Sequence, residues 1–152
     1  MITTKIPVRF NDCDAMGHVN NAVYYTYFEE GKREIFRLFT PSLDTNDWHV
    51  IVASTHCDYI EEIHYGVEVT VYSWIGRIGR TSFDVEHAIG SGGGKWHARG
   101  RVTLAGYDFQ NKKSVPLSEA IRTVLQQHQD GPDNVPELRA IKSVNSPQRV
   151  CF

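Results

Sequence analysis

The chain has 152 residues, which is enough to bury one hydrophobic core but short for two domains. Hydrophobic residues make up 41% and charged residues 22%, as in an ordinary globular protein, and a net charge of -2 does not predict nucleic-acid binding. No apolar run approaches the roughly 20 residues that span a bilayer, and the first residues lack the apolar core of a signal peptide, so we expect a cytoplasmic protein without a membrane span.

The first two predicted elements are a strand and a long helix. Residues 3–10 alternate, with Phe10 on the apolar side of the expected strand. Residues 22–39 show helical spacing, because their large apolar side chains fall on one stripe and charged residues fill much of the rest. Gly31 lies on the apolar stripe at a cost of about 1 kcal/mol relative to alanine, which is acceptable if it lets a sheet approach the helix closely. Pro41 is a stop signal.

From residue 48 onward the period changes from helical to two, which predicts strands. Alternating segments occupy residues 49–60, 66–76, 80–89 and 95–108. The sequence SGGG at 91–94 is typical of a hairpin connection. A short amphipathic helix is expected after Pro116. Residues 1–130 are therefore expected to form one domain, and residues 131–152 a tail that is loose or packed on the surface.

The order of elements is strand, helix, four strands, helix. Long alternating strands need one apolar face covered, and the helix at 22–39 is the large apolar helix available. We therefore predict an α+β fold in which an antiparallel sheet of about five strands curls around one long central helix, with a short helix added at the C-terminal side.

A polar loop, NDCDAMGHVNN at residues 11–21, separates the first strand from the apolar helix. One helix cap needs one side chain, and Asn20 or Asn21 supplies it, so the other polar groups call for another explanation. The first turn of a helix presents unpaired N–H groups and about half a positive charge, which suits a carbonyl oxygen that gains negative charge. Asp14 is placed to act at the same point as a nucleophile or as a base for water. The loop therefore predicts acyl transfer or hydrolysis.

The same loop contains other reactive residue types. Asp12, Asp14 and His18 have suitable metal-donor atoms, but no further spaced ligand follows, so we expect no metal. Cys13 alternates with its acidic neighbours and is expected to be a packed thiol. The three cysteines of the chain contain no CxxC pair, which predicts neither a disulfide framework nor a zinc knuckle.

The stretch RFNDCDAMGHVNNAVYYTYFEEGKREIF, residues 9–36, resembles the signature of the hotdog-fold thioesterases. It is most similar to the 4-hydroxybenzoyl-CoA thioesterase-like group, which includes acyl-CoA thioesterases. In that group Asp-x-Asp-x-x-Gly-x-Val follows a strand and precedes a helix with an early tyrosine and a later acid. The matching positions here are Asp12, Asp14, Gly17, His18, Val19, Tyr24 and Glu29. Fainter similarity extends over roughly residues 3–125, and the hotdog fold that it implies is the architecture predicted above.

The resemblance also implies roles for individual residues. Asp14 would be the catalytic carboxylate, and the backbone N–H of Asn21 would polarise the thioester carbonyl. The implied substrate-binding residues are Gly17, His18, Val19, Tyr24, Tyr27 and Glu29, of which the two tyrosines would line the acyl pocket. In the family, residues around the third long strand meet Coenzyme A at a subunit boundary. The sequence GRIGRTSF occupies that place here, which makes the CoA-binding candidates Arg80, Thr81 and Ser82.

The function implied by the resemblance is hydrolysis of acyl-CoA to a free carboxylic acid and Coenzyme A, without a cofactor. The family forms homodimers or homotetramers and takes part in lipid metabolism, and its carboxylate either attacks the thioester directly or activates water. Two other interpretations stay open. In the first, the protein hydrolyses the thioester of an acyl-carrier-protein and not of Coenzyme A. In the second, the chain is a non-catalytic acyl-binding module on the same fold.

Overall fold

The computed structural model describes residues 1–44, 46 and 49–139. Its elements are β1 (Ile2–Pro7), the 3-10 helix η1 (Phe10–Asp12), α1 (Val23–Phe36), β2 (Val50–Tyr59), β3 (Glu68–Ile78), β4 (Ser82–Gly90), β5 (Trp96–Asp108), β6 (Lys113–Ser114) and α2 (Glu119–Gln126). This order confirms the predicted one, to which the structure adds η1 and the two-residue β6. Residues 140–152 of the expected tail lie outside the described part of the chain.

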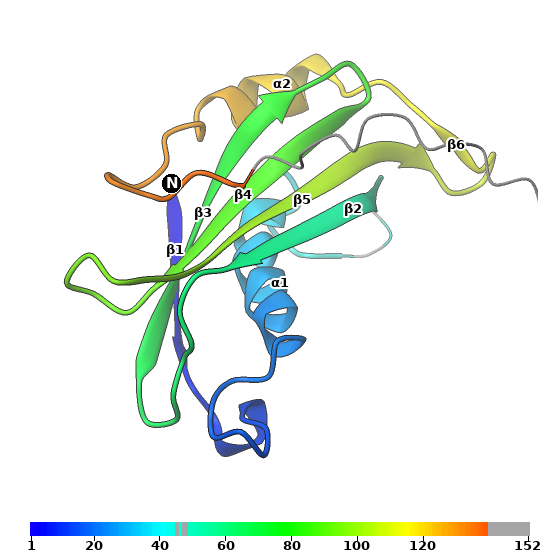
Figure 1. Ribbon diagram of the computed structural model, residues 1–152. Coiled ribbons are helices and arrows are strands. Elements are labelled where there is room, and N and C mark those ends of the chain that lie inside the picture. The colour runs from blue at the N-terminus through cyan, green and yellow to red at the C-terminus, as the bar shows by residue number, and fades with distance from the viewer. Residues whose placement is uncertain (45, 47–48, 140–152) are drawn as a thin grey trace, which may run out of the picture.

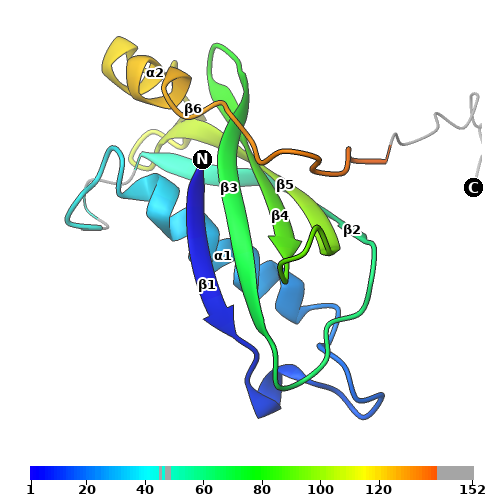
Figure 2. The ribbon, with the colours of Figure 1, turned by 90° about the vertical axis from the view of Figure 1, so that its left-hand side faces the viewer.

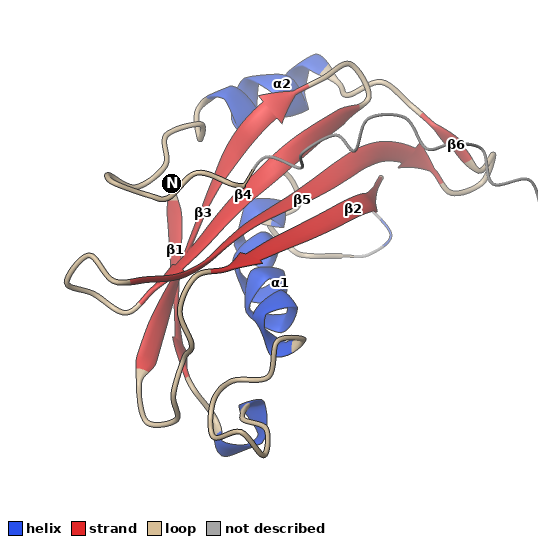
Figure 3. Ribbon diagram, viewed as in Figure 1, coloured by secondary structure: helices blue, strands red, loops and turns tan. Residues whose placement is uncertain are grey.

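The strands form one antiparallel sheet in the order β1-β3-β4-β5-β2, with β6 paired to the end of β5. Hairpins join β3 to β4 and β4 to β5, and the latter turn is the predicted SGGG connection. Strand β2 follows α1 in the chain but pairs with β5, so β1 and β2 lie at opposite edges. The sheet curls around α1, which lies against its concave face (Figures 1 and 3). The predicted architecture is therefore confirmed.

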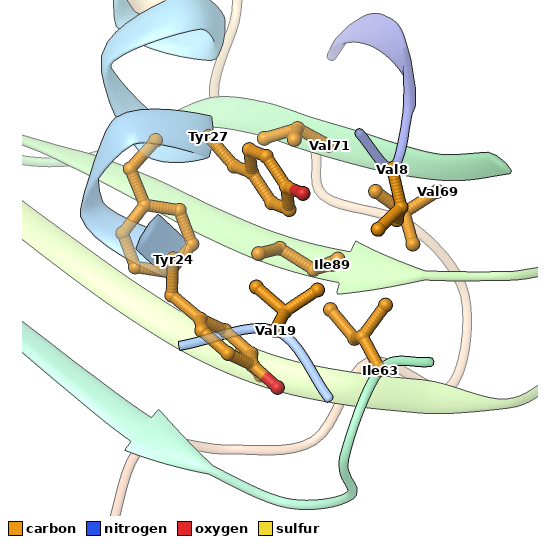
Figure 4. Close-up of a cluster of buried hydrophobic side chains, with 10 residues drawn as sticks. Val8, Val19, Tyr24, Tyr27, Ile63, Val69, Val71 and Ile89 are labelled. Atoms are coloured by element: carbon orange, nitrogen blue, oxygen red, sulfur yellow. The ribbon is translucent and has the colours of Figure 1, made fainter. Parts of the chain in front are cut away.

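The concave face holds the hydrophobic core. Helix α1 buries the stripe Tyr24, Tyr27, Phe28, Gly31, Lys32, Ile35 and Phe36. Its first half packs on β3 and β4 through residues such as Val69, Val71 and Ile89, each 0% exposed (Figure 4). Its second half packs with Val85 and Leu104 and with Leu125 of α2. These alternating side chains are buried against one helix, and this explains why the period-two pattern predicts the strands correctly.

Gly31 marks the closest approach of helix and sheet. A methyl group built on it would stand 2.5 Å from Ser73 Oγ and 2.9 Å from a methyl group of Val71. The Ser73 hydroxyl is itself 2.8 Å from Nδ1 of His87, whose ring stacks on Phe28 with centroids 5.1 Å apart. The expected reason for a glycine inside the helix is therefore confirmed.

Two predicted boundaries are wrong by three residues. The first strand ends at Pro7 and not at residue 10, because the chain turns into η1, and this leaves Phe10 78% exposed. Helix α1 ends at Phe36 and not at Phe39, because the amides of Leu38 and Phe39 donate to carbonyls three residues back, in the tighter 3-10 pattern.

The convex face of the sheet carries ion pairs whose carboxylates are buried. Glu86 on β4 lies 2.9 Å from Arg99 Nη2 and 2.6 Å from Arg101 Nε, both on β5. Asp84, two residues before Glu86 on β4, contacts Arg77 on β3 and accepts a hydrogen bond from Thr103. Residues 131–139, which we call the C-terminal strap, run across this face (Figure 2). Among the described residues, no helix combines the length and apolar character needed to cross a membrane.

Candidate active site

The predicted loop folds into a tight turn that returns toward the start of α1. Gly17 N–H donates to the carbonyl of Asp14 over 3.1 Å, and Asp14 N–H donates to the carbonyl of His18 over 3.1 Å. Gly17 has φ 86°, in the region that favours glycine, so this residue permits the reversal. Cys13 and Val19 form a β-bridge, and Val19 N–H donates to the carbonyl of Ile63. The turn is thus held against the segment that follows β2.

Asp14 is partly buried at the base of this turn. Its Oδ1 accepts a hydrogen bond of 2.9 Å from the backbone N–H of Met16. No residue in the described ranges donates a hydrogen bond to its Oδ2. One carboxylate oxygen is therefore oriented by the loop, and the other is available to a substrate or a water.

The start of α1 presents a backbone donor in a fixed direction. Asn20 closes the turn that leads into α1, because its Oδ1 accepts from Ala22 N–H over 2.9 Å and its carbonyl accepts from Val23 N–H over 2.9 Å. The carbonyl of Asn21 accepts from the Tyr59 hydroxyl over 2.8 Å. Within the described part of the chain, the Asn21 N–H has no acceptor. It is a helix-terminal donor of the kind that an oxyanion requires.

Asp14 and Asn21 line the same cavity, which has a volume of about 300 Å³. The complete lining is Asp14, His18, Val19, Asn21, Tyr24, Tyr59, Ile60, Glu61 and Glu62. Five of these residues belong to the predicted set. The other four come from the end of β2 and the following segment, and only the pairing of β2 with β5 brings them here. No local pattern in the sequence indicates them.

Aromatic rings form one side of the cavity. Tyr24, which is 3% exposed, meets Tyr59 edge to face with ring centroids 4.9 Å apart. Burial raises the pKa of both phenols, to about 12 for Tyr59. His18 stands at another side, 4.0 Å from the carboxylate of Glu62. Both phenols therefore stay protonated near neutral pH, and the Tyr59 hydroxyl donates to the Asn21 carbonyl.

Asp12 does not reach the cavity and has a structural role. It is 2% exposed and accepts hydrogen bonds from the backbone and guanidinium of Arg9 and from the Tyr27 hydroxyl, the last over 2.8 Å. Burial raises its pKa, but these bonds outweigh burial and leave the pKa below its usual value. Tyr27 is 1% exposed and points to Asp12, so the structure places it in the core and not in the lining of this cavity.

The remaining predicted residues lie elsewhere. Gly17 is exposed at the turn, and Glu29 lies on the outer side of α1, 2.6 Å from Lys32 Nζ. The CoA candidates Arg80, Thr81 and Ser82 occupy and follow the β3–β4 turn. Asp14 lies near the opposite end of the sheet, because it follows Pro7, which pairs with Glu68 at the start of β3. Within one chain, the CoA candidates and Asp14 are therefore separated by the length of β3, about 30 Å.

No group of three or more His, Cys, Asp or Glu side chains that could hold a metal ion occurs among residues 1–44, 46 and 49–139. The cysteines described are Cys13 and Cys57, both unpaired and partly buried. Burial raises the pKa of Cys57 to about 11, so its thiol stays protonated near neutral pH.

Comparison with known proteins connects this geometry with one family. Residues 8–125 match the family model described as the thioesterase-like superfamily. A predicted thioesterase from Bacillus stearothermophilus is 36% identical, with a TM-score of 0.80, over 86% of this chain and 97% of its own. A thioesterase from Thermus thermophilus, solved in complex with coenzyme A and Zn, is 32% identical, with a TM-score of 0.73, over 82% of this chain and 92% of its own. The uncharacterized protein YsmA of Bacillus subtilis is 25% identical over 80% of this chain and 82% of its own.

Proposed function

Since the chain belongs to the thioesterase-like superfamily, we propose that it hydrolyses acyl-CoA thioesters to a free carboxylic acid and Coenzyme A. The observation that carries this proposal is the cavity shared by Asp14 and the start of α1. The coenzyme A complex of the Thermus thermophilus relative supports Coenzyme A as the thiol carrier.

In the proposed reaction the thioester carbonyl lies between Asp14 and the Asn21 N–H. The carbonyl oxygen gains negative charge in the tetrahedral transition state, and the Asn21 N–H and the helix dipole stabilise it. Two routes fit this arrangement. Asp14 attacks the carbonyl carbon and expels the thiolate, and water then hydrolyses the mixed anhydride; or Asp14 takes a proton from the water that attacks. Both routes consume one water and end with the acid and the free thiol.

The test is Asp14→Asn, which keeps the size of the side chain and removes its charge. We expect kcat/KM for acyl-CoA hydrolysis to fall about 10³-fold, the usual contribution of such a group. Released thiol is measured across acyl-CoA esters of graded length and with an acyl-carrier-protein thioester. The matched control is Glu119→Gln on α2, whose side chain is 95% exposed.

Each result has one meaning. Unaltered turnover in Asp14→Asn removes this residue from the mechanism. Faster release from the acyl-carrier-protein thioester identifies that protein as the donor. Binding of acyl-CoA without hydrolysis by the wild-type protein supports the acyl-binding module instead.

We further propose a homodimer in which two β2 strands pair at their free edges. In the part of the chain that the structure describes, strand β2 pairs with β5 and with no other strand, and its Ile51 and Val52 are 40% and 45% exposed. Two identical edge strands related by a twofold axis perpendicular to them pair in antiparallel directions. The last residue of β2, Tyr59, would then lie near the first residues of the partner's β2.

This arrangement accounts for the distance between the two groups of predicted residues. Ala105 pairs with Ser82 on one side and with Ile51 on the other, so the β3–β4 turn and the start of β2 lie at the same end of the sheet. In the proposed dimer, Arg80 of the partner subunit comes to the end where Asp14 lies. A cationic side chain there suits the phosphates of Coenzyme A.

A further inference from the structure

We infer that Tyr59 is a positioning residue for the proposed reaction, and that the C-terminal strap holds it in place through Arg139. This inference rests on the proposed function, because Tyr59 acts on the peptide group beside the proposed oxyanion donor. The C-terminal strap would then affect catalysis, although it lies on the convex face of the sheet, opposite α1.

Tyr59 joins the end of β2 to the start of α1. Its hydroxyl donates to the Asn21 carbonyl over 2.8 Å, and its ring meets Tyr24 at an interplanar angle of 81°. Tyr24 is buried and cannot move without disturbing the core. The ring contact therefore fixes the phenol, and the phenol fixes the Asn21 carbonyl.

The direction of the Asn21 N–H depends on the two peptide groups that flank this residue. The preceding peptide is held by the bond from Val23 N–H to the Asn20 carbonyl. The following peptide is held on its N–H side by the Asn20 side chain and on its carbonyl side by Tyr59. A donor that is oriented before the substrate arrives stabilises developing charge without reorganisation. Tyr59 supplies part of this preorganisation.

The strap reaches Tyr59 from the convex face. Arg139 N–H donates to Asp58 Oδ2 over 2.7 Å, and its Nη2 donates to the Tyr59 carbonyl over 3.0 Å. Asp58 is 8% exposed, so its bond to the strap is shielded from water. Burial raises the pKa of Asp58, but its bonds to the strap and to His56 outweigh burial and lower it.

Two anchors upstream fix the path of the strap. Arg99 Nε donates to the carbonyl of Pro136 over 2.7 Å, while its guanidinium lies 4.7 Å from the centre of the Trp74 ring. Gly131 packs directly on Trp74, where an added methyl group would come within 2.8 Å of the ring. The strap thus contacts β3 and β5 before it reaches the end of β2 (Figure 2). The strap therefore restrains the end of β2, where Tyr59 lies.

The experiment combines two substitutions in one cycle. Tyr59→Phe keeps the ring and removes the hydroxyl, and we expect kcat to fall about fivefold with KM unchanged, the effect of one net hydrogen bond. Arg139→Ala is expected to lower kcat by a smaller factor. In the Tyr59→Phe background, Arg139→Ala should lower kcat no further, because both act through the same hydroxyl. Arg37→Ala, which removes a half-exposed arginine from the end of α1, is the control for charge.

Hydrogen exchange of the amides of residues 21–24 gives a readout that does not depend on turnover. Both variants should exchange faster there than the wild-type protein, and Arg37→Ala should not. Wild-type kcat in Tyr59→Phe, or effects of the two substitutions that multiply, would overturn the inference. Failure of the proposed function looks different, since the wild-type protein would then hydrolyse no thioester, or Asp14→Asn would remain active.

Discussion

Tyr27 donates its hydroxyl to Asp12 over 2.8 Å across the junction between the polar loop and α1. This bond separates the roles of two acids that lie two residues apart. Asp12 is saturated by Arg9 and Tyr27, whereas Asp14 keeps one carboxylate oxygen without a described donor. The Asp12 carboxylate therefore stabilises the loop, and the Asp14 carboxylate stays available for a substrate or a water.

Asp12→Asn is expected to lower the free energy of unfolding by about 2 kcal/mol, because it weakens several charge-assisted hydrogen bonds in a buried place. Asp14→Asn should change it by less than about 0.5 kcal/mol, as for other partly exposed positions. Urea denaturation followed by circular dichroism measures both. Equal losses in the two variants would contradict the division of roles.

Gly31→Ala is expected to destabilise the protein by about 1–3 kcal/mol, although alanine favours the helix. The added methyl group meets Ser73 Oγ at 2.5 Å, and the serine is held by His87. Thermal or urea unfolding checks the sign. The same substitution in a Ser73→Ala background should cost less, because the hydroxyl that it strikes is gone. A stabilised Gly31→Ala variant would show that the helix moves away from the sheet without penalty.

His87 predicts a dependence of stability on pH. Its side chain is fully buried, and burial, together with the charges of Lys32 and Arg99, lowers its pKa to about 3. In the unfolded chain a histidine takes up its proton near pH 6.5, so between about pH 6.5 and pH 3 the unfolded state binds more protons. The free energy of unfolding should therefore fall on acidification through this window, by up to about 1.4 kcal/mol per pH unit.

Urea midpoints between pH 5 and 7.5 test this expectation. His87→Gln should give a shallower slope than the wild-type protein. His49→Gln, at an exposed position, should keep the original slope. An unchanged slope in His87→Gln would mean that His87 takes up its proton over the same pH range in the folded and the unfolded protein.

Val52→Lys is expected to prevent assembly, because it places a charge on the exposed edge strand where the proposed interface forms. Sedimentation should show the wild-type protein as a dimer, or as a tetramer built from dimers, and the variant as a monomer. Val67→Lys is the matched control, since Val67 is 40% exposed but lies outside β2. A monomeric wild-type protein, or a Val52→Lys variant that still assembles, would refute the edge pairing.

Alternation predicts β3 well, because Val69 and Val71 face α1 and are buried against it. The same reasoning failed for Phe10, whose strand ends at Pro7. Alternation also marks Asp84 and Glu86 as outward and polar, yet both are buried, because arginines of neighbouring strands cover them. Those pairings depend on strand register, which a single sequence does not contain.

For the candidate site, the sequence indicates only the residues that are close to one another in the chain. Asp14 and Asn21 belong to the same loop and helix start, and both line one cavity in the structure. Tyr59 lies 38 residues further along, and its contact with the Asn21 carbonyl exists only once β2 has paired with β5. Glu29 fits the helical spacing of the motif but faces away from the cavity, toward Lys32.

The two faces of the sheet are held by different forces, apolar contact with α1 on one and the carboxylates that meet arginines beneath the strap on the other. Guanidinium ions carry the same head group as arginine and compete for those carboxylates, whereas urea is uncharged. The convex face should therefore loosen at a lower fraction of the unfolding midpoint in guanidinium chloride than in urea, so the choice of denaturant decides which side of this protein opens first.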